Sequence, residues 1–219
     1  TARAIVSFTD SYTQIKQIKQ NEQQDSESIS SLTDIASSLQ TLRNQIWENN
    51  TSKQVIQIPK LLKSLSALSR YKVETHLREE IELQRLKVRH WSRECLYWIQ
   101  DNGDAQDQTE IVNVGYGRVM SISFCTAGGK GEEQDKEIFN GLRSIYWFLS
   151  DLREGRNNDY QPSFQPLPLL ARRSEEQIEE EGANEEIEAQ MNNNGYDSNI
   201  MSNANWAKEV VLNHFILGG

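Results

Sequence analysis

The strongest pattern in this sequence is a stretch from residue 73 to residue 99 that fits one helix with apolar residues on two opposite sides. At roughly 100° per residue, one side collects Leu77, Ile81, Val88, Trp91, Cys95, Trp98 and Ile99. The other side collects Leu83, Leu86, His90 and Tyr97. Such a helix needs a partner on each side, so we expect one side to pack inside the chain and the other to meet more of this chain or a second protein.

Four further segments repeat apolar residues at spacings of three and four, which is typical of amphipathic helices. They are residues 4–18, 32–46, 61–68 and 132–153. Pro59 suits the first turn of the third, and Arg153 ends the fourth as the helix dipole favours. The sequence therefore predicts a mainly α protein, a bundle of about five helices with short connections, and it shows no internal repeat.

A different period follows residue 108. The apolar residues Val112, Val114, Tyr116, Met120, Ile122 and Phe124 occupy alternate positions, which is the period of a strand. Gly115 and Gly117 stand where a turn or bulge would bend it. Because residues 101–108 are acidic and contain glycine, we interpret them as a loop. We therefore expect a small β-hairpin insertion near residues 110–126 of a helical domain that covers residues 1–155.

The last third of the chain is more polar. Residues 155–168 contain three prolines, residues 175–190 are strongly acidic, and residues 191–205 are rich in asparagine. This composition predicts a largely disordered linker over residues 156–204. Residues 205–219 then form a short amphipathic helix with apolar positions that include Trp206, Val210 and Phe215. An apolar segment after a polar tether docks either on the chain's own bundle or on a partner.

The composition narrows the classes of partner and compartment. The net charge of −9 disfavours nucleic acid or an anionic membrane as the partner of the whole surface. No apolar run approaches the ~20 residues that a membrane-spanning helix needs. Two cysteines, Cys95 and Cys125, form neither a disulfide framework nor a metal-binding pair. We therefore expect an intracellular protein, in the cytoplasm or the nucleus.

One segment departs from the acidic average. Residues 53–93 contain ten Lys or Arg against four Glu. Arg78, Arg85, Arg89 and Arg93 form a basic strip along one side of the predicted 70–93 helix, with glutamates at helical spacing. A solvated face held by ion pairs is one interpretation of this strip. The other is a docking strip for an acidic partner, for the chain's own residues 175–188, or for a phosphate backbone.

The sequence offers no catalytic, cofactor or metal motif. Gly129-Lys130 resembles the end of a phosphate-binding loop, but Phe124 and Gly131 stand where that motif needs a glycine and a Ser or Thr. His76 and His90 lie about 21 Å apart along the predicted helix, too far to share one metal ion. We therefore expect neither a metal nor a cofactor.

These patterns predict a non-catalytic scaffold or adaptor subunit of a multi-protein assembly, either oligomeric or in a complex with other subunits. The expected contacts are Leu83, Leu86 and Tyr97 on one helix and Trp206, Val210 and Phe215 on the last. Five aromatic residues are expected to anchor packing or interfaces: Trp91, Tyr97, Trp98, Trp147 and Trp206. Two rivals remain, a nucleic-acid-associated protein that uses the basic strip and a small enzyme with a dispersed site.

Overall fold

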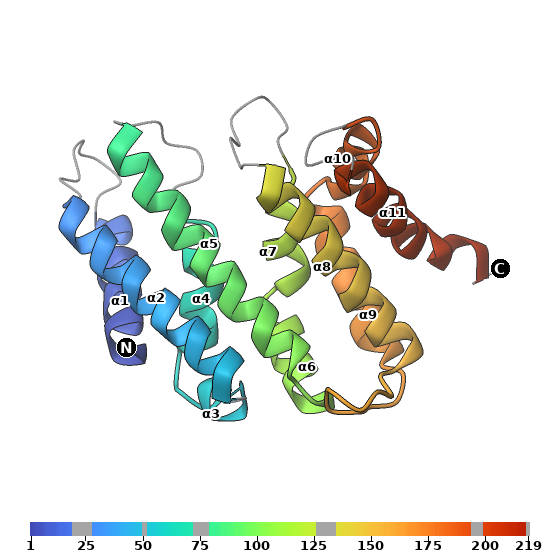
Figure 1. The fold of residues 1–219 in the computed structure, drawn as a ribbon, viewed down its shortest axis with the longest axis horizontal. Helices are drawn as coiled ribbons and strands as arrows, with labels where there is room; N and C mark the ends of the chain where they lie inside the picture. The colour runs from blue at the N-terminus through green and yellow to red at the C-terminus, as the bar shows by residue number, and fades with distance from the viewer. Residues whose placement is uncertain (19–27, 50–51, 72–78, 126–134, 194–198, 218–219) are drawn as a thin grey trace. The chain divides into compact units, whose positions relative to one another are not determined.

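The computed structural model describes residues 1–18, 28–49, 52–71, 79–125, 135–193 and 199–217. Within these ranges the regular structure consists of α-helices and one isolated β-bridge (Figure 1). The helices are α1 (Ala2–Ile18), α2 (Ile29–Asn49), α3 (Ser52–Ile56), α4 (Leu61–Leu68), α5 (Glu79–Asp101), α6 (Ala105–Asn113), α7 (Tyr116–Ile122), α8 (Asp135–Glu154), α9 (Pro168–Glu180), α10 (Ala183–Gln190) and α11 (Asn199–Leu217). The predicted mainly α class is confirmed.

The chain divides into two compact units, Thr1–Asn102 (unit 1) and Gly103–Gly219 (unit 2). This division falls inside the predicted domain of residues 1–155. Each unit contains its own set of buried apolar side chains.

Unit 1 is a two-layer arrangement in which α2 packs along α5 and α1 packs on α4 (Figure 1). The Cys95 thiol donates to the Leu39 carbonyl at 3.4 Å, and the Trp47 and Trp98 rings meet at 6.1 Å, so α2 and α5 run in the same direction. The predicted stripe of α2 is buried as expected, at Leu32, Ile35, Leu39, Leu42 and Ile46. The predicted two-sided helix is helical from Glu79 onward, and residues 73–78 lie outside the described residues.

Unit 2 begins with a helix where a loop and a hairpin were predicted. Asp104 caps α6 by accepting from the Gln106 and Asp107 amides at 3.0 and 3.1 Å, and the Asp107 carboxylate accepts from the Asp104 amide at 3.0 Å. Gly115, with φ +81°, separates α6 from α7. The prediction of a β-hairpin near residues 110–126 was wrong, because residues 110–124 are helical or turn and none of the described residues of that segment is in a strand.

The alternation of apolar residues misled the prediction because it did not count two apolar residues of the same segment, Ile111 and Val119. The buried set is Ile111, Val112, Tyr116, Val119, Met120 and Phe124. With Ile111 and Val119 included, the spacings are those of two short helices joined at Gly115 rather than those of a strand. The reciprocal Asp104–Asp107 cap was the sequence signal for a helix start, in a segment interpreted as a loop.

Where a disordered linker was expected over residues 156–204, the structure has α9, α10 and the first residues of α11. Pro168 opens α9, and the buried positions that follow are mostly small or polar: Ala171, Ser174, Ile178, Ala183, Ile187 and Gln190. A Cβ on Gly117 of α7 would lie 2.9 Å from the Ser174 carbonyl oxygen, so α7 and α9 approach closely. Few large apolar residues were needed to bury these helices, which is why the composition resembled a linker.

Residues 155–167, which precede α9, are non-helical, and a closed loop forms their first part. Arg156 and Phe164 form an antiparallel bridge with N–H···O distances of 2.8 and 2.9 Å. The buried Arg156 guanidinium lies 4.9 Å from the Phe164 ring centroid and pairs with Asp151 at 2.6 Å. These contacts fix both ends of the loop on unit 2.

Candidate protein-interaction surfaces

The outer side of α5 carries the residues predicted to face a partner. Leu83 is 47% exposed, whereas Leu86 and Tyr97 are half-buried. The opposite side of the helix, with Val88, Cys95 and Ile99, is buried. We call Leu83, Leu86 and Tyr97 the α5 outer face. The two-sided pattern therefore corresponds to one covered side and one side that remains at the surface.

An aromatic cluster extends this surface onto α2 near the end of α5. Trp47, which the sequence analysis did not single out, is 53% exposed. The Arg43 guanidinium lies 5.1 Å from the Trp47 ring centroid and 5.3 Å from that of Trp98, and it pairs with Glu94 at 3.4 Å. Stacking on two indole rings holds the guanidinium in place and leaves an aromatic surface with a paired charge. The signal for Trp47 was its position directly after the buried stripe of α2.

The predicted basic strip is not a surface feature. Arg85, Arg89 and Arg93 are 1%, 4% and 4% exposed, and Arg78 lies outside the described residues. Arg89 pairs with Glu82 at 3.0 Å and donates to the Tyr71 carbonyl at 3.1 Å. Because the three arginines are buried, neither interpretation of the basic strip, as a solvated face or as a docking surface, describes them.

The physical role of the buried arginines follows from their acceptors. Arg93 donates to the Ser69 carbonyl at 3.4 Å, so Arg89 and Arg93 both bind carbonyls of the segment that follows α4. Buried carbonyls in the turns after a helix lie outside its hydrogen-bond ladder and need donors from elsewhere in the fold. The two guanidinium groups satisfy them and join α5 to the end of α4. The sequence showed the four-residue spacing of the arginines but not these acceptors.

The last helix docks on its own unit through the side that includes Val210. Ile200, Ala204, Ala207, Val210 and Val211 are buried, and α11 packs on α8 and α10. Val210 therefore belongs to the interior of unit 2 rather than to an open contact surface. Trp206 remains 50% exposed, and the side chain of Phe215 lies outside the described residues.

Trp206 belongs to a second aromatic cluster, formed by α8 and α11. The Tyr146 ring lies 5.9 Å from that of Trp206 and 5.0 Å from that of Trp147, measured between ring centroids. Trp147 is 51% exposed. Contacts of Tyr146 with Trp206 and of Arg153 with Val210 show that α8 and α11 run in the same direction. We call Tyr146, Trp147 and Trp206 the unit 2 aromatic cluster.

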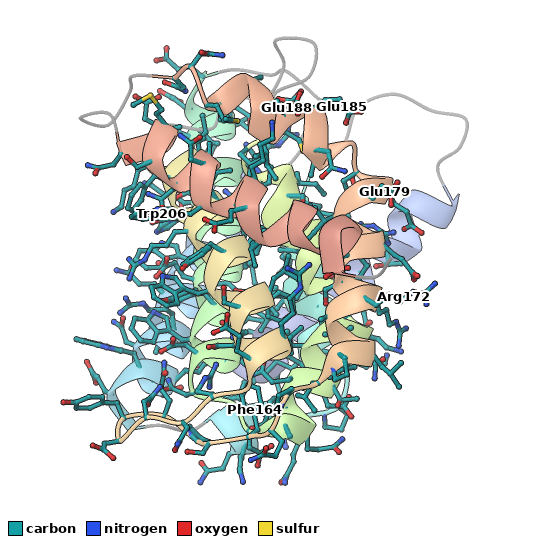
Figure 2. All side chains as sticks on the ribbon, turned by 90° about the vertical axis from the view of Figure 1, so that its right-hand side faces the viewer. Phe164, Arg172, Glu179, Glu185, Glu188 and Trp206 are labelled. Carbon is teal, nitrogen blue, oxygen red and sulfur yellow. The ribbon has the colours of Figure 1, made fainter. Side chains whose placement is uncertain are left out.

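The acidic residues of α9 and α10 lie on another side of unit 2. Figure 2 shows Trp206 at the left edge of the view, Glu179 toward the right edge, and Glu185 and Glu188 at the top. Several of the acidic residues form ion pairs within the unit: Arg118 with Glu180 and with Glu181, Arg153 with Glu175, Arg172 with Glu176, and Lys208 with Glu188. The segment expected either to dock or to stay disordered is thus a folded, negatively charged surface.

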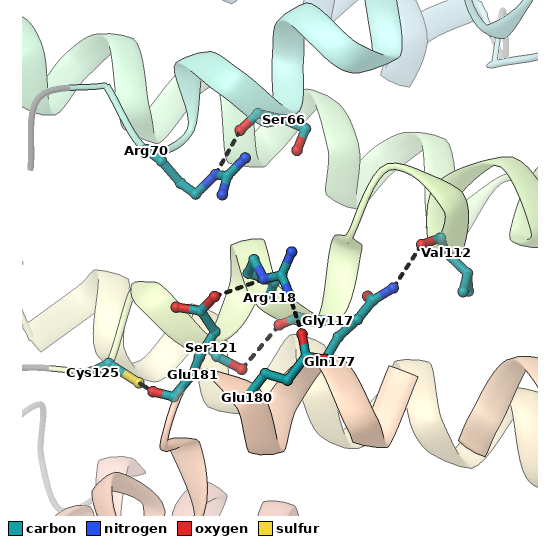
Figure 3. Close-up of polar contacts among 10 residues, drawn as sticks. All are labelled: Ser66, Arg70, Val112, Gly117, Arg118, Ser121, Cys125, Gln177, Glu180 and Glu181. Atoms are coloured by element: carbon teal, nitrogen blue, oxygen red, sulfur yellow. Dashed lines mark hydrogen bonds and ion pairs between the residues drawn. The ribbon is translucent and has the colours of Figure 1, made fainter. Parts of the chain in front are cut away.

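Polar contacts of α6, α7 and the residue Cys125 with α9 and its junction with α10 fix that surface (Figure 3). Arg118 of α7 contacts both Glu180 and Glu181, and the Gln177 amide donates to the Val112 carbonyl at 2.9 Å. The Cys125 thiol donates to the Glu181 carbonyl at 3.8 Å. Burial is the main cause that raises the pKa of Cys125 to about 12, with Glu186 and Glu181 adding to it.

The other candidate chemistry gives no assembled centre. Burial raises the pKa of the Cys95 thiol well above its ordinary value, which is typical of a packed side chain. His90 stacks edge-on against Trp91 at 4.7 Å; residues 126–134, with Gly129-Lys130, and His76 lie outside the described residues. In the described ranges, no three His, Cys, Asp or Glu side chains are placed to hold a metal ion. None of the helices of this part of the chain is long and apolar enough to cross a membrane.

Comparisons with known proteins do not assign the chain to a family: no family model, no curated protein and no solved structure matches it.

Proposed function

We propose that this chain is a non-catalytic scaffold or adaptor subunit that binds another protein through unit 1. The observation that carries the proposal is the exposure of large apolar side chains on the outer sides of packed helices, above all Leu83 and Trp47. Exposed leucine and tryptophan on a fixed helical surface are typical of protein-protein contacts, in which tryptophan contributes a large share of the binding energy.

The geometry of the α5 outer face favours a helical partner. Leu83 and Leu86 are one turn apart, Tyr97 lies about 16 Å farther along the helix axis than Leu86, and Trp47 stands beside the end of α5. An amphipathic helix that lies along α5 would place apolar residues at successive turns against these side chains. The paired Arg43 and Glu94 next to Trp47 would contribute polar contacts at the rim of such an interface.

The rival nucleic-acid function has lost its main support. Binding a phosphate backbone requires accessible Lys or Arg side chains. Arg85, Arg89 and Arg93 are instead buried, and Arg89 and Arg93 donate to carbonyls of their own unit. We also propose an intracellular location, which the two free thiols support.

Site-specific crosslinking tests the proposal directly. A photoreactive phenylalanine analogue replaces Leu83 in the full chain, which is expressed in its source cells, irradiated and purified. We expect a protein adduct at this position, identified by mass spectrometry, because Leu83 would lie inside the interface. The identified partner is then purified, and its affinity for the chain is measured by calorimetry before and after Leu83→Asp and Trp47→Ala.

Lys63 provides the matched control, because it is an exposed polar residue of α4 and does not belong to the α5 outer face. Its replacement by alanine should change affinity less than threefold, whereas Leu83→Asp should weaken it at least about tenfold. A partner that binds equally well to wild-type, Leu83→Asp and Trp47→Ala chains would overturn the proposed surface. Absence of any adduct that depends on Leu83 would do the same.

A further inference from the structure

The outer side of α8 carries a stripe of residues at spacings of four, three and four. Arg143, Trp147, Ser150 and Glu154 lie along it, and they are exposed except for the half-buried Ser150. Alternate spacings of three and four are those by which two helices contact each other along a seam. The opposite side of α8 supplies core residues such as Ile145 and Phe148, so this stripe points away from the interior of unit 2.

The stripe has opposite charges at its two ends, and its two central side chains differ in size. Arg143 stands toward the N-terminus and Glu154 toward the C-terminus, about 16 Å apart along the helix axis. Between them Trp147 is large and Ser150 is small. The arrangement is therefore complementary to itself in the antiparallel direction, since reversing the helix places acid against base and a large side chain against a small one.

We infer that this face of α8 binds a second copy of the chain, with the two α8 helices antiparallel about a twofold axis near residues 148 and 149. Arg143 of each copy then pairs with Glu154 of the other, and each Trp147 covers the other copy's Ser150. Such an isologous contact uses the same patch on both molecules and closes as a dimer.

The unit 2 aromatic cluster enlarges the contact beyond one helix. A stable interface buries roughly 800 Å² on each partner, more than a single stripe of four residues supplies. Tyr146 joins Trp147 to Trp206, so the exposed side of α11 continues the same surface. Two half-exposed tryptophans per copy provide the aromatic anchors that strong contacts use.

The charge of unit 2 favours this face over the others for self-association. Residues 103–219 contain 20 Asp or Glu and 9 Lys or Arg, so most contacts between two copies of unit 2 would be repulsive. Figure 2 shows Glu179, Glu185 and Glu188 away from the edge that carries Trp206. Contact through α8 keeps these carboxylates apart and brings opposite charges together. The inference is independent of partner binding by unit 1, because it uses different residues.

Charge reversal in sedimentation equilibrium tests the pairing. The full chain is examined from about 1 to 100 μM at physiological salt, as wild type, Arg143→Glu, Glu154→Arg and the double variant. We expect a wild-type dimer, a dissociation constant raised at least about tenfold in each single variant, and a return to within about threefold of wild type in the double variant. Recovery in the double variant requires that the two residues face each other across the interface.

Arg172→Glu is the matched control, because it changes the net charge as Arg143→Glu does but lies on the exposed surface of α9. It should leave the dissociation constant within about threefold of wild type, and Trp147→Ala should raise it at least about tenfold. Circular dichroism verifies that each variant is folded. A chain that is monomeric at 100 μM, or a dimer unaffected by Arg143→Glu and Trp147→Ala, would overturn the inference and leave the unit 1 proposal untouched.

Discussion

The two units use their charged residues in opposite ways. Unit 1 contains 14 Lys or Arg and 12 Asp or Glu, and it buries three arginines of α5. Unit 2 contains 9 Lys or Arg and 20 Asp or Glu. Most of the ion pairs of its acidic helices α9 and α10 lie at least partly in solvent. Charge on α5 of unit 1 is thus part of the packing, whereas charge in unit 2, apart from the buried Arg156, is mainly a property of the surface.

The difference matters because burial changes what a charge contributes. A buried guanidinium must be paired and hydrogen-bonded, and its removal leaves its acceptors without compensation. An exposed ion pair contributes little, because water and salt screen it. Unit 1 should therefore be sensitive to loss of an arginine, and unit 2 should depend more on close backbone packing.

Among the tests of this contrast, replacing Arg89 by Met has the largest expected effect on stability. The change keeps an apolar stem but removes the donor to the Tyr71 carbonyl and one of the two arginines that pair with Glu82, so that only Arg85, at 3.6 Å, remains beside this carboxylate. We expect a loss of about 2–3 kcal/mol in the free energy of unfolding of unit 1, below the full cost of a broken buried pair because Glu82 keeps contact with water. Urea unfolding, with hydrogen exchange to assign the loss to unit 1, measures it.

Arg118→Met is the matching change in unit 2. Its partners Glu180 and Glu181 are partly exposed, so the expected loss is below about 1 kcal/mol. Equal losses in the two variants would remove the contrast between the units.

Gly141→Ala tests the dependence of unit 2 on close packing. An added Cβ would lie 1.9 Å from the Ser123 hydroxyl oxygen and 3.0 Å from the Met120 carbonyl oxygen, so the serine side chain must rotate and α7 and α8 must move slightly apart. We expect a loss of about 1–3 kcal/mol in thermal or urea unfolding. Ser123→Ala in the same chain should restore part of it by removing the nearest atom. A Gly141→Ala chain more stable than wild type by the full helix-propensity gain of about 1 kcal/mol would contradict the close approach of these helices.

Asp104→Ala tests the start of unit 2. The change removes the acceptor of two amides in the first turn of α6, and we expect a loss of about 1 kcal/mol in the free energy of unfolding. Asp104→Asn keeps a side-chain oxygen and should lose less. Faster hydrogen exchange confined to the first turn of α6 would localise the effect, and equal losses for Ala and Asn would argue against the cap.

The last comparison concerns the two cysteines, one in each unit, whose replacement should have the smallest effect on stability at neutral pH. Cys95 is fully buried and Cys125 is half-buried, so iodoacetamide at pH 8 should modify Cys125 first, and more slowly than a free thiol because its pKa is raised to about 12. Unfolded Cys125 loses its proton near pH 9, whereas the folded thiol keeps it to about 12. The unfolded state therefore binds fewer protons in this window, and stability falls as the pH rises.

Cys125→Ser should remove that part of the pH dependence between pH 8 and 10 and change stability little at pH 7. Urea unfolding at several pH values measures the difference between the two chains. An unchanged slope in the variant, or modification of Cys95 before Cys125, would contradict the expected environments.

Helices with large apolar residues on one side were predictable, whereas elements that pack through small or polar residues were not. The stripe from Leu32 to Ile46 predicted α2 because leucine and isoleucine at helical spacing have no other stable arrangement. Ala171 and Ser174 bury α9 against the glycine of α7 without any such stripe. Of the predicted contact residues, Leu83 and Trp206 are exposed and Val210 is buried, and the exposed Trp47 was not among them.

The sequence by itself determined the helical class and the positions of α1, α2, α5 and α8, because hydrophobic periodicity is a local property of the chain. Only the tertiary structure decided which side of a polar helix faces inward. The spacing of Arg85, Arg89 and Arg93 places them on one side of α5 whether that side faces water or the interior. The carbonyls of Tyr71 and Ser69, which accept from Arg89 and Arg93, come within reach only when α4 and α5 pack together. Burial of a charge depends on partners that are distant in the chain, and periodicity carries no information about them.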